Sequence, residues 1–176
     1  RLGTSELSVP SDPVTPEEFA SICFDEDGEY GLVPPSPNFH FGKGIGDFTA
    51  ELWIKPGIKQ GAKGHETQGL PEVVVPFLGC KDWITDVAPG WQIFGKEWYW
   101  GVSIGDGREC VVCEHKGVLE PSSWHHLAFT YNRTKAQCIT YLDGVAGVPV
   151  TNLKLGAVQP NCPLTIGKSS AELQDR

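Results

Sequence analysis

The chain contains no methionine, few basic residues and no long apolar run, and each shortage carries information. Its 14 lysines and arginines face 22 acidic residues, which gives a formal net charge of −8. That charge excludes nucleic acid as a general partner, because there is no basic patch to neutralise phosphates. No apolar segment reaches the ~20 residues that span a bilayer, so we expect no membrane insertion. The chain begins at Arg1 without a signal peptide, and we interpret it as a mature or excised segment of a larger polypeptide.

Helical periodicity beyond two turns is also missing, and glycine and proline divide the sequence. The 21 glycines and 14 prolines cut it into short segments of the length that strands and turns require. We therefore predict an all-β fold, with a polar lead-in over residues 1–16 and one domain over residues 17–176. Residues 59–72 are predicted to form a long exposed loop. The predicted strands cover residues 20–24, 29–33, 38–41, 47–55, 73–78, 90–94, 98–104, 109–114, 124–131, 138–142 and 164–166.

Residues 124–144 predict a β-hairpin. Every second side chain from Leu127 to Tyr131 is apolar, so this strand has one apolar and one mixed face. Residues 132–135 are polar and turn-prone, and a second β-rich run follows them. Asp143-Gly144 then predicts a tight turn, because glycine tolerates the positive φ that such turns need.

Four further segments combine with this hairpin into a recognisable pattern. They are Phe24–Tyr30, Gly46–Pro56, Gly90–Ile93 and Pro163–Gly167. With the Trp-His-His opening and Tyr-x-Asp-Gly ending of the hairpin, they resemble in order the laminin G-like and pentraxin-like jelly rolls of the concanavalin A-like superfamily. The resemblance covers roughly residues 22–168 and implies a two-sheet antiparallel β-sandwich. It does not imply one function, because this scaffold carries lectins, glycosidases, adhesion modules and spacers.

One element of that family is missing from the sequence. A Gly-x-Ile-Asp-Glu-like closing strand normally follows the Ile-Gly motif, whereas Lys168–Arg176 is polar and shows no such strand. We expect that the closing strand lies on a segment absent from this chain or that Leu7-Ser8-Val9 takes its place. An unpaired sheet edge would otherwise invite association.

Six cysteines are spread over the whole chain, at positions Cys23, Cys80, Cys110, Cys113, Cys138 and Cys162. In a jelly roll this even number favours up to three disulfides and an oxidising compartment. Cys110-Val-Val-Cys113 has the spacing of a redox or zinc half-site, but it lies on a predicted strand. Residues three apart on a strand point to opposite faces, so we expect these two cysteines not to pair with each other. Sequence does not choose among the 15 possible connectivities.

The acidic run at residues 25–29 has three interpretations. Asp25, Asp27 and Glu29 alternate, as the carboxylates of glycan-cleaving jelly rolls do, but Asp27-Gly28 indicates a turn that breaks the alternation. The same turn offers Asp25 and Asp27 as ligands for one structural Ca²⁺, which the family resemblance also implies. The third interpretation is a solvated turn. Weaker calcium candidates stand in other loops, at Asp82, Asp86 and Asp106.

His125 and His126 invite a metal or general-base interpretation. Adjacent strand residues face opposite ways, so we predict instead that one packs in the sandwich with a backbone partner and the other is exposed. Asn132-Arg133-Thr134 is a glycosylation acceptor triplet in the predicted hairpin loop, which favours a glycan at Asn132.

The densest aromatic cluster suggests a ligand surface. Along residues 98–104, one face carries Trp98, Trp100, Val102 and Ile104 and is predicted to be core. The other face, with Tyr99 and Ser103, is predicted to be exposed and flat enough for a sugar or a protein, and Tyr99, Ser103 and Trp98 are the candidate ligand-binding residues. The alternative is that both faces are covered and the cluster is only core.

These observations predict a secreted or cell-surface module that binds and does not catalyse. Its expected ligand is a glycan or an extracellular protein, its only expected cofactor is the structural Ca²⁺, and no catalytic residue is assigned. A spacer domain without sugar affinity is the alternative. A glycan-cleaving enzyme is the third hypothesis, and its Glu-x-Asp-x-x-Glu carboxylate arrangement is absent from the sequence.

Overall fold

The structure, a computed structural model, describes residues 21–24, 29–34, 46–57, 59–60, 66–67, 74–81, 87–96, 99–160 and 162–168. Every regular element within these residues is a strand, which confirms the all-β prediction. The strands are β1 (Gly31–Val33), β2 (Phe48–Ile54), β3 (Lys59–Gln60), β4 (Glu66–Thr67), β5 (Val75–Gly79), β6 (Gly90–Lys96), β7 (Tyr99–Gly105), β8 (Cys110–His115), β9 (His125–Asn132), β10 (Gln137–Leu142), β11 (Val145–Ala146), β12 (Val150–Thr151) and β13 (Leu164–Ile166). The described part of the chain contains no helix long and apolar enough to cross a membrane.

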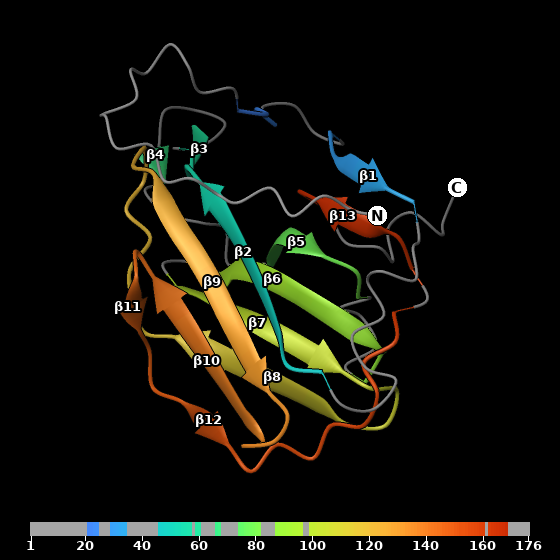
Figure 1. Ribbon diagram of the computed structural model, residues 1–176. Coiled ribbons are helices and arrows are strands. Elements are labelled where there is room, and N and C mark those ends of the chain that lie inside the picture. The colour runs from blue at the N-terminus through green and yellow to red at the C-terminus, as the bar shows by residue number, and fades with distance from the viewer. Residues whose placement is uncertain are drawn as a thin grey trace, which may run out of the picture.

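Two antiparallel sheets form a sandwich (Figure 1). Sheet A has six strands in the order β1-β13-β5-β6-β7-β8. Sheet B has five, in the order β11-β10-β9-β2, with β12 also paired to β10. The predicted two-sheet antiparallel sandwich is therefore confirmed.

The predicted hairpin forms as β9 and β10, and its alternation places one face in the core. Leu127, Phe129 and Tyr131 are each at most 1% exposed. The Asp143-Gly144 turn joins β10 to β11, with Leu142 opposite Val145, and both turn residues have positive φ, 51° and 80°. Two successive positive φ values define the turn type that matches the twist of a two-residue hairpin, which explains the Asp-Gly pair.

The core is built from the inward faces of both sheets. From sheet A come Trp91, Ile93, Trp100, Val102 and Ile104, all at most 3% exposed. Aromatic rings lock the layers together: the Phe129 ring of sheet B lies 5.6 Å from Trp91 of sheet A and 5.5 Å, edge-on, from Phe48 of its own sheet. The predicted core face of β7 is confirmed at Trp100, Val102 and Ile104, and Trp98 lies outside the described residues.

The strand predictions need three corrections. Residues 21–24 were expected to belong to a strand, but they have no regular structure. Residues 59–72 were expected to be loop only, but β3 and β4 pair within them. The two-residue strands β11 and β12 were not predicted, because so short a segment shows no periodicity. The lead-in, the strand at 38–41, Leu7-Ser8-Val9 and residues 169–176 lie outside the described part of the chain.

Candidate functional site

The ligand surface predicted on β7 does not exist at Ser103. Its side chain is 1% exposed, and its hydroxyl lies 3.4 Å from the Cys110 sulfur on the neighbouring strand. Gln92, which is opposite Ser103 on β6, is fully buried as well. This part of the outward face of sheet A is covered, so the prediction of an exposed surface there is wrong. Tyr99 is half-buried, and its role in binding stays a prediction.

The predicted calcium ligands Asp25 and Asp27 lie outside the described residues, as do Asp82 and Asp86. Asp106 is described, and its carboxylate is engaged by the backbone. Its Oδ1 accepts hydrogen bonds from the Arg108 and Glu109 amides at 2.7 Å, and its Oδ2 accepts one from Gly156 at 2.5 Å. These bonds hold the pKa of Asp106 below its ordinary value despite some burial, and they tie two loops together. Among the described residues, no group of three or more His, Cys, Asp or Glu side chains is placed to hold a metal.

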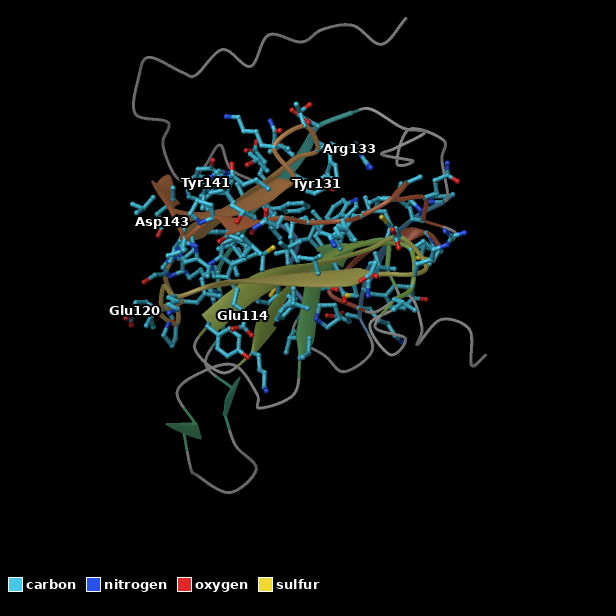
Figure 2. All side chains as sticks on the ribbon, turned by 90° about the horizontal axis from the view of Figure 1, so that it is seen from below. Glu114, Glu120, Tyr131, Arg133, Tyr141 and Asp143 are labelled. Carbon is cyan, nitrogen blue, oxygen red and sulfur yellow. The ribbon has the colours of Figure 1, made fainter. Side chains whose placement is uncertain are left out.

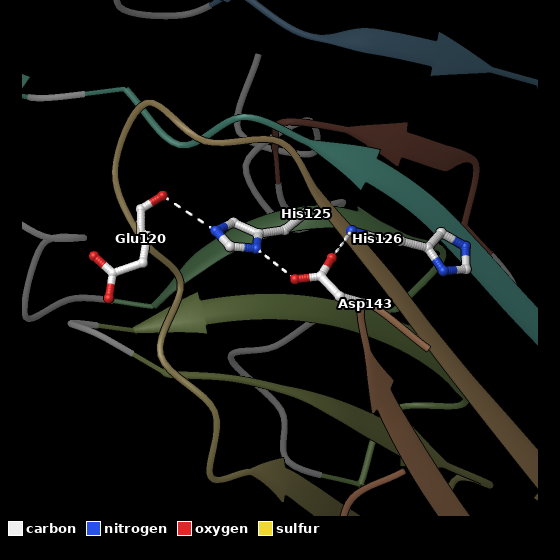
Figure 3. Close-up of polar contacts among 4 residues, drawn as sticks. All are labelled: Glu120, His125, His126 and Asp143. Atoms are coloured by element: carbon white, nitrogen blue, oxygen red, sulfur yellow. Dashed lines mark hydrogen bonds and ion pairs between the residues drawn. The ribbon is translucent and has the colours of Figure 1, made fainter. Parts of the chain in front are cut away.

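His125 is packed with a backbone partner as predicted, whereas His126, predicted to be exposed, is only partly exposed. His125 is buried and its Nε2 lies 3.2 Å from the Glu120 carbonyl oxygen, a backbone partner. Its Nδ1 donates to Asp143 Oδ2 at 2.9 Å (Figure 3). Asp143 Oδ1 also accepts the His126 backbone N–H at 2.8 Å, so one carboxylate fixes the start of β9 and the end of β10. His126 points the other way, and its side chain is 24% exposed.

Asp143→Asn should lower the free energy of unfolding at pH 7 by about 1 kcal/mol, since a partly exposed charged hydrogen bond is weakened by solvent. Asparagine suits the positive φ, so the variant removes the charge and one of the two acceptor oxygens without straining the turn. The bond to His125, aided by the His126 amide, lowers the pKa of Asp143 below 3.8. A lowered carboxyl pKa contributes stability above pH 3.8 that is lost as pH falls through the folded-state pKa. Urea unfolding should therefore show the two proteins converging below pH 3.8; an equal gap at pH 7 and pH 3 would contradict this.

The outward face of sheet B is the strongest candidate site in the described structure. We use "outer face" for the side chains of β2, β9 and β10 that point away from the core: Thr49, Glu51, Trp53, His126, Ala128, Thr130, Ile139 and Tyr141. Figure 2 shows Tyr141 on the outward side of one layer and Glu114 on the outward side of the other. Trp53 is the most exposed tryptophan among the described residues, at 65%.

The register of the strands groups five of these side chains. Trp53 is opposite His126, with ring centroids 5.1 Å apart and planes tilted by 38°. The Glu51 carboxylate lies 3.4 Å from His126 Nε2. Glu51, Ala128 and Tyr141 form the next row across the three strands. Because alanine is short, the centre of that row is low, and it is bordered by an indole, an imidazole, a carboxylate and a phenol.

A hollow of about 280 Å³ adjoins the outer face at the Asn132 end. Asp47, Thr130, Asn132 and Gln137 contribute to its lining. The Asn132 side chain is fixed there: its Nδ2 donates to Asp47 Oδ2 at 2.8 Å, and its Oδ1 accepts from the Lys135 amide at 2.7 Å. A glycan joined to Nδ2 leaves one hydrogen on that atom, so the Asp47 bond is compatible with the modification, which stays a prediction.

Sequence reasoning overlooked Trp53, although the strand carries a signal. In β2 the inward positions are Phe48, Ala50, Leu52 and Ile54, and the outward positions are Thr49, Glu51 and Trp53. A tryptophan in the polar phase of an alternating strand is an aromatic side chain placed in solvent. Its ring packs against His126 and lies among polar side chains, so it is a candidate contact for a ligand.

Comparison with solved structures decides the fold. The binding domain of Paraclostridial mosquitocidal protein 1 superposes with a TM-score of 0.62 at 16% identity, covering 82% of this chain and 34% of that one. Mouse laminin α1 domains LG4-5 give 0.52 at 14% identity, covering 72% and 29%. The CBM40 domain of Ruminococcus gnavus IT-sialidase, bound to α2,3-sialyllactose, gives 0.51 at 8% identity, covering 72% and 66%.

The fold is a concanavalin A-like jelly roll. At these identities the likeness establishes this jelly roll and nothing about its ligand. The chain spans about a third of the length of the toxin and laminin chains that it matches. No family model and no curated protein matches the jelly roll by sequence.

Proposed function

We propose that this jelly roll is an extracellular, non-catalytic carbohydrate-recognition module that binds its ligand on the outer face of sheet B. The observation that carries the proposal is the 65% exposure of Trp53 on the otherwise polar outward face of β2. The fold supports it, because the CBM40 domain that shares this fold was solved with a bound sugar. The alternative is a protein ligand, for which an exposed tryptophan serves equally well as an anchor.

The chemistry of the outer face fits a pyranose ring. The flat indole of Trp53 offers an apolar surface to the C–H face of a sugar. Glu51 accepts hydrogen bonds from sugar hydroxyls, and His126, beside both, supplies ring nitrogens. The carboxylate beside Trp53 is that of Glu51, so this part of the outer face favours a neutral sugar over a sialylated or sulfated one.

The strand that carries Glu51 does not supply a pair of catalytic carboxylates. Glycoside hydrolysis uses two of them facing the same bond. The neighbours of Glu51 on the outward side of β2 are Thr49 and Trp53, and its neighbour across the strand is Ala128. This arrangement supports binding over catalysis.

Trp53→Ala tests the proposal directly. We expect glycan-array screening followed by calorimetry to identify a neutral glycan, and the variant to weaken its binding about 10- to 30-fold, the loss typical of a tryptophan anchor. Trp53→Phe should recover part of the affinity. Tyr99→Ala changes the opposite sheet and should leave affinity unchanged, and thermal unfolding checks that all three variants fold.

The controls separate the alternatives. If Tyr99→Ala abolishes binding and Trp53→Ala does not, the ligand occupies sheet A and the proposed site is wrong. If no glycan binds the wild-type protein, the carbohydrate proposal fails and the protein-binding alternative stands.

Repeating the titration with a chelator tests the predicted calcium site at Asp25 and Asp27, because loss of bound metal should weaken binding or lower the Tm.

A further inference from the structure

Two cysteines from different sheets meet in the core of the sandwich. Cys113 of β8 and Cys138 of β10 are at most 1% exposed, and the proximity of the Cys113 thiol is the largest cause of the raised pKa of Cys138. β8 and β10 pack against each other across the sandwich. Two residues further along both strands, His115 Nδ1 and Thr140 Oγ1 lie 3.1 Å apart. Two successive inward pairs in contact fix the register of the facing strands, so the approach of the two sulfurs belongs to the packing of the sheets.

A second pair lies where β5 and β13 run together. Cys80 follows the last residue of β5, and Cys162 precedes β13. The pairing of Gly79 with Thr165 brings these two strand ends side by side. Both cysteines are buried in the core, 0% and 7% exposed. Burial, with a smaller contribution from the nearby Cys162, raises the pKa of Cys80 to about 12.

The remaining cysteines are far apart. Cys110 lies on β8, at one edge of sheet A, and its sulfur is near Ser103 on the outward side. Cys23 is exposed, and the ring of its neighbour Phe24 lies beside Gly167 at the end of β13. β13 and β8 are separated by β5, β6 and β7, so four strand spacings of ~4.8 Å lie between them. A disulfide needs Cα atoms within about 7 Å, which excludes a Cys23–Cys110 bond in this fold.

We propose that the oxidised protein carries two disulfides, Cys113–Cys138 joining the sheets and Cys80–Cys162 joining β5 to β13, and keeps Cys23 and Cys110 as thiols. All six cysteines are thiols in this structure. The oxidant class is a small disulfide such as oxidised glutathione. One cysteine thiolate of each pair attacks it and releases one reduced glutathione, and its partner then attacks the mixed disulfide and releases the second. Each bond thus takes two electrons and two protons from the protein and reduces one glutathione disulfide.

The order of events follows from burial. All four cysteines are at most 7% exposed, so a dissolved oxidant does not reach them in the folded protein. Thiolate is the attacking species, and the pKa of one thiol in each pair is raised, that of Cys80 by burial and that of Cys138 by the adjacent Cys113 thiol and burial. Oxidation must therefore precede burial, during folding. Refolding the reduced chain in a glutathione redox mixture should give both bonds, whereas the same mixture added to the folded, reduced protein should act at least 10-fold more slowly.

Peptide mapping without reduction tests the connectivity. After refolding, alkylation and trypsin digestion, we expect residues 109–116 linked to residues 136–154, and residues 64–81 linked to residues 155–168. Fragmentation of the first pair should place the alkyl group on Cys110, which shares its peptide with Cys113. A Cys110–Cys113 bond, any bond to Cys23, or six alkylated cysteines would overturn the proposal.

Thermal unfolding gives an independent measurement. Reduction should lower the Tm of the oxidised wild-type protein by roughly 5–15 °C. In a Cys113→Ala/Cys138→Ala variant, reduction should lower the Tm by less than in the wild type, because one cross-link is already missing. Cys110→Ala is the matched control on the same strand and should show the same fall in Tm on reduction as the wild type. If the double variant fails to fold, the fall in the wild-type Tm on reduction still tests the proposal. An unchanged wild-type Tm on reduction would contradict the two cross-links.

Discussion

Replacing Gly90 by alanine is expected to cost about 3–5 kcal/mol of the free energy of unfolding, which is much of what a domain of this size has. Gly90 begins β6 with a φ of +129°, a conformation that L side chains rarely adopt. An added Cβ would also overlap the Cys80 carbonyl oxygen, which belongs to the backbone and cannot swing away. The Cys80 amide donates to the Trp91 carbonyl oxygen at 2.8 Å, so the clash falls on the ladder between β5 and β6. Urea unfolding followed by tryptophan fluorescence measures the loss.

Gly107→Ala is the matched control for that experiment. Its φ of +90° is also positive, but apart from its own chain neighbours no described residue has an atom within 4 Å of where its Cβ would stand. Only the backbone strain applies, so we expect a loss of about 1–2 kcal/mol. Equal losses at the two glycines would show that the close approach of Cys80 contributes nothing.

The fold was predictable because, in a strand with one buried face, apolar residues alternate with polar ones. In β9 the phase of Leu127, Phe129 and Tyr131 identified the core side, and Asp143-Gly144 identified the turn after β10. The same alternation assigned Ser103 correctly to the outward phase of β7. It could not show that the outward side is covered there, because covering depends on segments far away in the sequence. The alternation therefore predicts which face of the sheet a side chain is on. Whether that face is covered depends on the rest of the chain.

The candidate site was less predictable for a related reason. The crowded aromatic run around Trp100 suggested a ligand surface, although its described inward members are core. Trp53 stands alone in its segment, and the other outer-face rings, His126 and Tyr141, are more than 70 residues away along the chain. Only the register of β2 with β9 and of β9 with β10 joins them. A count of residue types over a short stretch of sequence detects only residues that are close along the chain. A binding face also joins residues that are far apart in the sequence.

The second large effect is expected at Trp100, the largest fully buried side chain among the described residues. Its indole stacks on His115 with centroids 5.3 Å apart and planes 19° apart. Trp100→Ala should lower the free energy of unfolding by about 3–5 kcal/mol, because it removes most of that side chain and leaves a cavity between the sheets. Trp100→Phe should cost much less. The indole Nε1 is buried with no hydrogen-bond partner among the described residues, and phenylalanine removes that penalty of about 1–3 kcal/mol while losing some packing.

The pH dependence of the free energy of unfolding of the same variants shows whether Trp100 also excludes water from His115. Burial lowers the pKa of His115 below its ordinary 6.5, although the contact with Thr140 opposes the shift. Between the folded-state pKa and 6.5 the unfolded chain binds more protons, so stability is full above pH 6.5 and is lost as pH falls through the folded-state pKa. Water entering the cavity of Trp100→Ala should raise the pKa of His115 toward 6.5, so the stability of this variant should fall less as the pH falls. Trp100→Phe should keep the pH dependence of the wild type. Chevron or urea measurements from pH 7.5 to 5 decide the matter, with His115→Gln as the baseline that lacks the titration. Equal slopes in wild type and Trp100→Ala would mean that the indole fills space beside His115 without controlling its protonation.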